Sequence, residues 1–203
     1  MDRRRYLRVV WLVGFVAAAV LVGLVVRLYR ESAGTMSLAT SGAALIGGPF
    51  TLIDQDGKTR TDAEFRGSLM LVYFGYTYCP DVCPTELQTM SDALDALGDK
   101  SASVQPIFIT VDPERDTPPV VKDYVGHFHP RFIALTGTPG QIEVAEKAYR
   151  VYAAKAASKT GGNDYLMDHT GLVYLMDRNG KYLTSFTPQT TPQEMAQAIA
   201  KRL

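Results

Sequence analysis

The sequence predicts an α/β domain, with a central sheet flanked by helices, behind an apolar N-terminal segment. Three observations predict this class. Two continuous apolar runs, at 69–77 and 104–112, are typical of strands buried in the middle of a sheet. Segments with helical spacing separate such runs, and several of them open with Thr-Pro, which is a helix start signal. An uncharged run of 18 residues at positions 9–26 approaches the thickness of a bilayer.

The apolar run predicts a membrane anchor. As a helix, residues 9–26 would be about 27 Å long. Arginine is concentrated in the eight residues before the run, so the positive-inside rule places the N-terminus in the cytoplasm. A cleaved signal peptide is the alternative, but charged and bulky residues occupy 27–31, where a cleavage site needs small ones. Since eight residues leave no room for a transit peptide, we expect a bacterial inner-membrane protein.

The predicted organisation has four parts. Residues 1–8 form a cytoplasmic N-terminus, 9–28 a transmembrane anchor, 29–48 a flexible tether and 49–203 one exported domain, in the periplasm or outside the cell. The formal net charge is zero, with 21 basic and 21 acidic residues. This balance argues against a nucleic-acid-binding protein, because such proteins carry a basic surface.

The first elements of the domain follow from local signals. Residues 50–61 predict a hairpin around an Asp-Gly pair, and 69–77 predict the first buried strand. A helix is then predicted to begin at Pro84, with Cys83 just outside it, and to stop at Gly98.

The later elements complete a recognisable order. After the second buried strand, the sequence predicts a helix start at Thr117-Pro118, a strand at 131–137 and a long helix from 138. Residues 171–186 predict a second hairpin around an Asn-Gly pair, and Thr191, Pro192 and Glu194 supply the start of a last helix. Strand, helix, strand, helix, hairpin and helix are the order of a thioredoxin-like domain. Active cysteines in that fold lie where the first central strand gives way to a helix.

The chain holds two cysteines, Cys79 and Cys83, in YCPDVCP at 78–84. A disulfide closing so short a loop would contribute only about 2 kcal/mol, against nearly 5 for a hundred-residue loop, so a purely structural bridge is a weak explanation. A redox dithiol and a pair of thiolate metal ligands both stay open. In either case the N-terminus of the predicted helix favours thiolate over thiol, which predicts reactive cysteines.

Three histidines are available as a further ligand. His127 and His129 lie in GHFHP, after an amphipathic helix, and we interpret them as surface or capping residues. His169 lies in YLMDHTG, directly before the strand of the second hairpin. In a thioredoxin-like fold the loop before that strand passes beside the cysteines, so His169 is the candidate ligand.

Three motifs carry a specific resemblance. FGYTYCPDVCP, DPERDTP at 112–118 and DHTGLVYLMDRNG at 168–180 resemble the SCO/SenC family of copper chaperones, in the same order and behind a similar anchor. The resemblance implies one copper ion per domain, bound by Cys79, Cys83 and His169, and a role in assembling the CuA centre of cytochrome c oxidase subunit II. It also implies an alternative, a thiol-disulfide oxidoreductase that keeps the oxidase cysteines reduced, so enzymatic activity stays open. Other periplasmic copper chaperones or thiol-disulfide oxidoreductases are further expected partners.

The chemistry of the donors agrees with copper. Two thiolates and an imidazole suit Cu(I), while the nitrogen keeps Cu(II) accessible. Structural zinc usually takes four protein ligands, and the chain has no third cysteine. A thiol peroxidase is disfavoured, because Thr77-Tyr78-Cys79 departs from a T-x-x-C pattern and the one tryptophan lies in the predicted anchor.

Other residues near the motifs are weaker candidates. Asp168 could orient the imidazole or bind axially, although a solvated acid is the plainer interpretation, and Met167 is expected to pack in the core. The remaining candidates are expected to cap helices, form turns or pack beside the cysteines: Asp112, Asp116, Thr117, Tyr76 and Tyr78.

Overall fold

The computed structural model describes residues 21–23, 27, 45–156 and 165–203. The chain divides into two units, 1–44 and 45–203. The predicted N-terminus (1–8), anchor (9–28) and tether (29–48) lie wholly or mostly outside the described residues, and they stay predictions. Within the described ranges no helix has both the length and the apolar character needed to cross a membrane.

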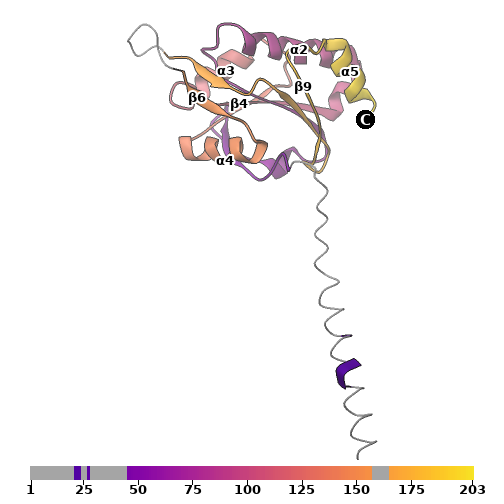
Figure 1. Ribbon diagram of the computed structural model, residues 1–203. Coiled ribbons are helices and arrows are strands. Elements are labelled where there is room, and N and C mark those ends of the chain that lie inside the picture. Colours follow the sequence, from indigo (N-terminus) through magenta and orange to yellow (C-terminus); the bar gives the residue numbers. More distant parts are fainter. Residues whose placement is uncertain (1–20, 24–26, 28–44, 157–164) are drawn as a thin grey trace, which may run out of the picture. The chain divides into compact units, whose positions relative to one another are not determined.

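A seven-stranded mixed sheet forms the centre of the larger unit, in the order β2-β1-β5-β4-β3-β8-β9 (Figure 1). β3 pairs in parallel with β4, and β4 with β5, whereas the pairs to the outer strands are antiparallel. The strands are β1 (Thr51–Asp54), β2 (Thr59–Thr61), β3 (Leu69–Gly75), β4 (Val104–Thr110), β5 (Ile133–Thr136), β8 (Val173–Met176) and β9 (Tyr182–Phe186).

Helices cover both faces of this sheet. They are α2 (Val82–Leu97), α3 (Pro118–Val125), α4 (Pro139–Tyr149) and α5 (Pro192–Ala200), with short 3-10 helices η1 (Asp62–Phe65) and η2 (Gly98–Ser103). Figure 1 shows α2, α3 and α5 on one side of the sheet and α4 on the other. The predicted α/β class is therefore confirmed, including both predicted hairpins.

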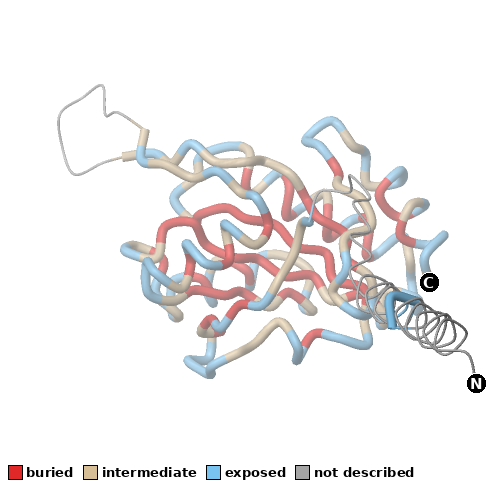
Figure 2. Tube along the Cα trace, turned by 60° about the horizontal axis from the view of Figure 1, so that its bottom comes forward, coloured by how far each residue is buried: buried red, intermediate tan, exposed pale blue. Residues whose placement is uncertain are grey.

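Alternation along β3 assigns side chains to the two layers. Tyr73 and Phe108 are register partners on one face, where Phe108 packs against Tyr124 of α3 with ring centroids 5.5 Å apart. Phe74 faces the other way and packs against Tyr149 of α4 at 5.3 Å. All seven residues of β3 are buried, and the buried trace runs through the centre of the domain in Figure 2. Such a strand reads as a continuous apolar run because both of its faces are covered.

The helix starts explain the Thr-Pro signals. Thr117, Thr138 and Thr191 are the N-caps of α3, α4 and α5, and proline follows each of them. Thr191 and Glu194, predicted at the start of the last helix, form a capping box, in which each side chain bonds the backbone of the other. Gly98 ends α2 with a φ of 55°, a conformation that favours glycine.

One predicted boundary is wrong in a way that affects the cysteines. α2 begins at Val82, not Pro84, so Cys83 lies inside the first turn of the helix. A proline at the third helical position is tolerated because the first N–H groups of a helix have no intrahelical partner.

The sequence also failed to predict a small second sheet. β6 (Ala153–Lys155) and β7 (Met167–His169) pair antiparallel, with Ala153 opposite His169. With three residues each, these strands are too short to give a recognisable period.

Candidate metal centre

The cysteine pair lies at the junction between β3 and α2. Cys79 belongs to the connecting loop and is half-buried, whereas Cys83 is fully buried in the first turn of α2. The backbone N–H of Cys83 donates to Cys79 Sγ at 3.4 Å. One of the free N–H groups of the helix start thus points at the Cys79 sulfur, which favours the thiolate there.

Glycine at position 75 makes room for Cys83. A Cβ atom added to Gly75 would lie 3.0 Å from Cys83 Sγ and 2.8 Å from the Tyr73 ring. These separations are shorter than an ordinary van der Waals contact of about 3.5–4.0 Å. Gly75 therefore lets the buried sulfur approach the end of β3 closely.

β7 brings His169 over the cysteines. Its Nε2 lies 3.5 Å from Cys83 Sγ, and its ring meets Tyr73 and Tyr76 edge-on, with centroids 6.1 and 5.8 Å away. Nδ1 lies 3.2 Å from the carbonyl oxygen of Thr170. Since a carbonyl only accepts, this hydrogen bond places the proton on Nδ1 and leaves the Nε2 lone pair facing the sulfurs.

The three side chains converge on one point. Cys79 Sγ, Cys83 Sγ and a His169 ring nitrogen all lie within 4.8 Å of one another, and the part of the chain that the structure describes holds no other group of three potential ligands. Metal–sulfur and metal–nitrogen bonds of about 2.3 and 2.0 Å would subtend an angle of about 110° across a gap of 3.5 Å. Two sulfurs can share an ion up to about 4.6 Å apart, so small side-chain movements suffice to close the set.

Electrostatics separates the two thiols. The pKa of Cys79 is held well below that of an ordinary thiol, first by the hydrogen bond from the Cys83 side chain and also by backbone N–H groups at the start of α2. The pKa of Cys83 is raised, because its proton serves that hydrogen bond and because it is buried. The pair therefore carries one negative charge, on the more exposed sulfur.

Two buried groups border Cys83. Tyr73 OH donates to Cys83 Sγ at 3.6 Å, and burial raises the pKa of this tyrosine. Glu86, one turn further along α2, is 2% exposed, and burial raises the pKa of its carboxyl. Burial thus disfavours a negative charge on Cys83, whereas the Tyr73 hydroxyl provides a hydrogen bond to the thiolate that forms when a cation replaces the proton.

The weaker candidates are placed as follows. Tyr76 is buried against His169, while Tyr78 is 55% exposed. Met167 packs against the core, which confirms that prediction, and Asp168 is exposed on the opposite side of β7 from His169. Asp168 does not join the converging group.

The histidines of GHFHP lie outside the group. His127 is exposed, with Nε2 4.0 Å from Asp123. His129 Nδ1 accepts a hydrogen bond from the backbone N–H of Arg131 at 3.3 Å. His127 agrees with the predicted surface role, whereas His129 is largely covered and supports the turn between α3 and β5.

Asp112 and Asp116 do more than the expected turn formation. Both are buried, at 2% and 0% exposure. Asp116 accepts hydrogen bonds from Thr77 in the cysteine loop, and Asp112 accepts them from Tyr165 and Arg115. No local sequence signal could have revealed Thr77 and Tyr165, which lie 39 and 53 positions from their partners.

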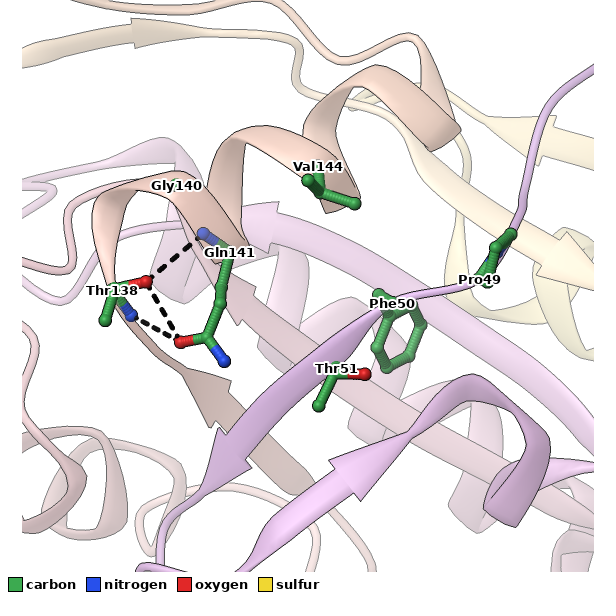
Figure 3. Close-up of a pocket in the computed structure, with 7 residues that line it drawn as sticks. All are labelled: Pro49, Phe50, Thr51, Thr138, Gly140, Gln141 and Val144. Carbon is green, nitrogen blue, oxygen red and sulfur yellow. Dashed lines mark hydrogen bonds between the residues drawn. The ribbon is translucent and has the colours of Figure 1, made fainter.

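A cavity elsewhere in the domain has no comparable chemistry. It measures about 370 Å³ and lies at the start of α4 (Figure 3). Figure 3 shows that Gln141 turns back toward Thr138, whose backbone N–H donates to the Gln141 side chain at 2.9 Å. Because this capping box uses the polar groups at the helix start, the cavity offers little to a charged ligand.

Comparison with known proteins adds a family to this geometry. The sequence profile of the family described as SCO1/SenC matches residues 38–203, well over half of the chain. The chain belongs to the SCO1/SenC family. The matched region includes all three motifs and the three converging residues, and the predicted membership is confirmed.

Individual relatives agree with the family match. Protein SenC of Rhodobacter capsulatus is 43% identical over 159 residues, which are 78% of this chain and 71% of that protein. The structure of Bradyrhizobium japonicum ScoI with copper bound is 49% identical, has a TM-score of 0.72 and is matched over 78% of this chain and 99% of that one. BsSco, described as having a disulfide switch and as a member of the Sco family of cytochrome c oxidase assembly proteins, is 26% identical, with a TM-score of 0.60 over 78% and 94%. These SCO structures confirm the thioredoxin-like fold of the domain.

Proposed function

We propose that this SCO1/SenC protein is a membrane-anchored copper metallochaperone. Cys79, Cys83 and His169 bind one copper ion, which the protein carries as cargo toward the CuA centre of cytochrome c oxidase subunit II. The observation that carries the proposal is the convergence of two sulfurs and one lone-pair nitrogen within 4.8 Å. The copper-bound ScoI structure and the oxidase-assembly role stated for BsSco support it.

The burial of the ligands suits release as well as binding. Cys83 is fully buried, but Cys79 and His169 are partly exposed. An incoming thiolate or imidazole from a partner therefore reaches the copper from the side of Cys79 and His169. Cys83 remains as the last protein ligand, and the soft three-coordinate set leaves room for the incoming group.

We place the anchor in the bacterial inner membrane, with residues 1–8 in the cytoplasm and the copper domain in the periplasm. The uncharged run and the arginines before it support this arrangement. The protein should stay with the membrane fraction after an alkaline wash. A mature N-terminus beyond residue 30 would show that the segment is a cleaved signal peptide.

A second function, thiol-disulfide exchange, is favoured by the asymmetry of the cysteines. The Cys79 thiolate, the more accessible of the two, attacks a partner disulfide, forms a mixed disulfide and releases one partner thiolate. Cys83 then loses its proton and attacks Cys79 Sγ, which releases the second partner thiolate and leaves an intramolecular disulfide. Two electrons pass to the partner, so the same pair could keep the CuA cysteines reduced.

Copper titration of the reduced protein tests the main proposal. We expect one Cu(II) per domain, with a thiolate-to-copper charge-transfer band, and little uptake by the disulfide form. His169→Ala should lose Cu(II) while retaining part of the Cu(I) affinity, because two thiolates still hold Cu(I). His127→Ala, on an exposed histidine, is the matched control. Equal uptake by reduced and oxidised protein would exclude the cysteines as ligands.

An experiment in cells distinguishes copper delivery from thiol-disulfide exchange. Strains carrying His169→Ala or Cys79→Ser are compared for cytochrome c oxidase activity at low copper. Loss of activity in both strains supports copper delivery. Full activity with His169→Ala and none with Cys79→Ser makes thiol chemistry the essential task.

A further inference from the structure

We propose that the loop 112–116 positions the two halves of the copper site separately. One arm of the loop, Asp116, holds the segment that carries the cysteines. The other arm, Asp112 with Arg115, holds the hairpin that carries His169. This inference rests on the proposed function, since it concerns the same site.

The first arm is a buried carboxylate. Asp116 Oδ1 accepts from Thr77 Oγ1 at 2.6 Å, and Oδ2 accepts from the Thr77 backbone N–H at 3.0 Å and from Thr110 Oγ1 at 2.6 Å. Thr77 lies two residues before Cys79, and Thr110 ends β4. Thr136 of β5 also donates to the carbonyl of Asp116 at 2.6 Å. The start of the cysteine loop is thereby tied to the ends of two central strands.

The second arm reaches the histidine hairpin through Tyr165. Asp112 accepts from Tyr165 OH at 2.8 Å with one carboxylate oxygen, and from Arg115 Nε with the other. Arg115 Nη1 in turn donates to the carbonyl of Tyr165 at 3.0 Å, and its guanidinium lies 3.7 Å from the centroid of that ring. Tyr165 lies two residues before β7, the strand that ends at His169.

The hairpin needs such an attachment. β6 and β7 share three residue pairs and belong to a sheet of their own, and a two-stranded hairpin alone is marginally stable in water. The exchanged bonds between Tyr152 and Thr170 fix only its base. An exposed pair of Lys155 with Glu114 adds little, because solvent-exposed ion pairs are weak. Met167 and Ala153 pack against the core, and the partly buried arm through Tyr165 adds the polar attachment that orients the strand carrying His169.

Arg115 also lies over the rings of Tyr76 and Tyr78 in the cysteine loop. A test of the hairpin arm must therefore leave Arg115 in place and change only the Tyr165 hydroxyl. Tyr165→Phe removes one hydroxyl and keeps the ring beneath Arg115. The Cu(II) affinity of this variant should fall about tenfold, because loss of a group that orients a metal ligand typically costs about 10- to 100-fold. The Cu(I) affinity should change less than about threefold, because both thiolates stay in place. Tyr152→Phe makes the same change on an exposed tyrosine of the same hairpin, and it should alter neither affinity.

The cysteine arm should behave differently. Asp116→Asn and Thr77→Val each disturb the Asp116 hydrogen bonds, so Cu(I) and Cu(II) affinities should fall together, by about tenfold. Thr77→Ser retains the hydroxyl, so both copper affinities should stay near those of the wild type. This comparison separates positioning from a general loss of stability. If Asp116→Asn does not fold, Thr77→Val still tests the same hydrogen bonds.

Hydrogen exchange of the full-length, copper-free protein gives a readout independent of copper. In Tyr165→Phe the amides of Ala156 and Thr170, which bond across the hairpin, should exchange at least tenfold faster. The amide of Val111, bonded to Gly75 beside the cysteine loop, should not change. Unchanged exchange together with an unchanged ratio of Cu(II) to Cu(I) affinity overturns the inference. If wild-type protein binds no copper, the proposed function fails, and the exchange rates alone decide on the positioning.

Discussion

Gly75→Ala tests whether the end of β3 must stay bare to hold Cys83 in place. The added Cβ would meet Tyr73 Cε1 at 2.8 Å, Cys83 Sγ at 3.0 Å and Phe108 Cε2 at 3.1 Å. All three side chains are 0% exposed, so none can turn into solvent. The sulfur or the rings must move, and both movements disturb the proposed copper site.

The size of the effect follows from these contacts. Overfilling a packed core costs about 1–3 kcal/mol, and three short contacts with buried groups place Gly75→Ala near the upper end. A loss of about 3 kcal/mol lowers the Tm of a domain of this size by roughly 6–12 °C. Displacing Cys83 Sγ should also weaken copper binding by at least about tenfold, the equivalent of 1.4 kcal/mol.

The measurement pairs thermal unfolding with copper competition against a chelator. Gly140→Ala is the matched control, because its Cβ would meet nothing within 4 Å and it lies within α4. Alanine there should leave copper affinity unchanged and add about 0.5–1 kcal/mol of helix stability. If Gly75→Ala matches wild type in both Tm and copper affinity, the close approach of the sulfur plays no part in the site.

Three further predictions concern single side chains. Tyr73→Phe removes the hydroxyl that donates to Cys83 Sγ, so copper affinity should fall by about tenfold or more, as measured by chelator competition, since hydrogen bonds to charged groups contribute about 1.5–3 kcal/mol; an unchanged affinity would contradict the contact. Because the pKa of Cys79 is lowered, its thiolate persists in acid, and its iodoacetamide rate should stay nearly flat from about pH 8 to 5, where an ordinary thiol loses about tenfold per unit; a tenfold loss per unit would refute the shift. Burial and the neighbouring Glu143 raise the pKa of Glu146 from 4.5 to about 7, so the folded state binds this proton more tightly and stability falls as pH rises through that window. Glu146→Gln should therefore stabilise the protein at about pH 8 but not at about pH 4 in urea unfolding, unlike the exposed control Glu143→Gln, and an equal gain at both would exclude the titration.

The sequence predicted the layers of the fold well because their signals are local. Thr-Pro marks the starts of α3, α4 and α5, and the run at 69–77 marks β3. The two central strands end two residues earlier than predicted, since their ladder stops at the pair of Gly75 with Thr110. The residues that follow, at 76–77 and 111–112, leave the sheet and support the site, and the sequence pattern alone does not distinguish them from the strands.

The sequence was sufficient to propose candidate ligands but not to find the residues that support them. Cys79, Cys83 and His169 stood out because the chain has so few residues of these kinds. From the sequence, Asp116 was expected to cap a helix or form a turn. In the structure its carboxylate accepts a hydrogen bond from Thr77, which lies 39 positions away. Such contacts depend on how β3 and β4 lie side by side, and one sequence without its fold holds no signal of that distance.

The proposed ligands come from two different parts of the fold, and this matters for how one site could both bind copper and form a disulfide. A disulfide needs only Cys79 and Cys83, which lie on one continuous stretch at the start of α2. The proposed copper site needs the same sulfurs together with His169, which arrives on a hairpin outside the main sheet. Since a disulfide consumes both thiolates, copper and disulfide exclude each other. A change in the hairpin alone would therefore alter copper binding without altering the dithiol, so the attachment of β6 and β7 would set the balance between delivering copper and reducing a partner.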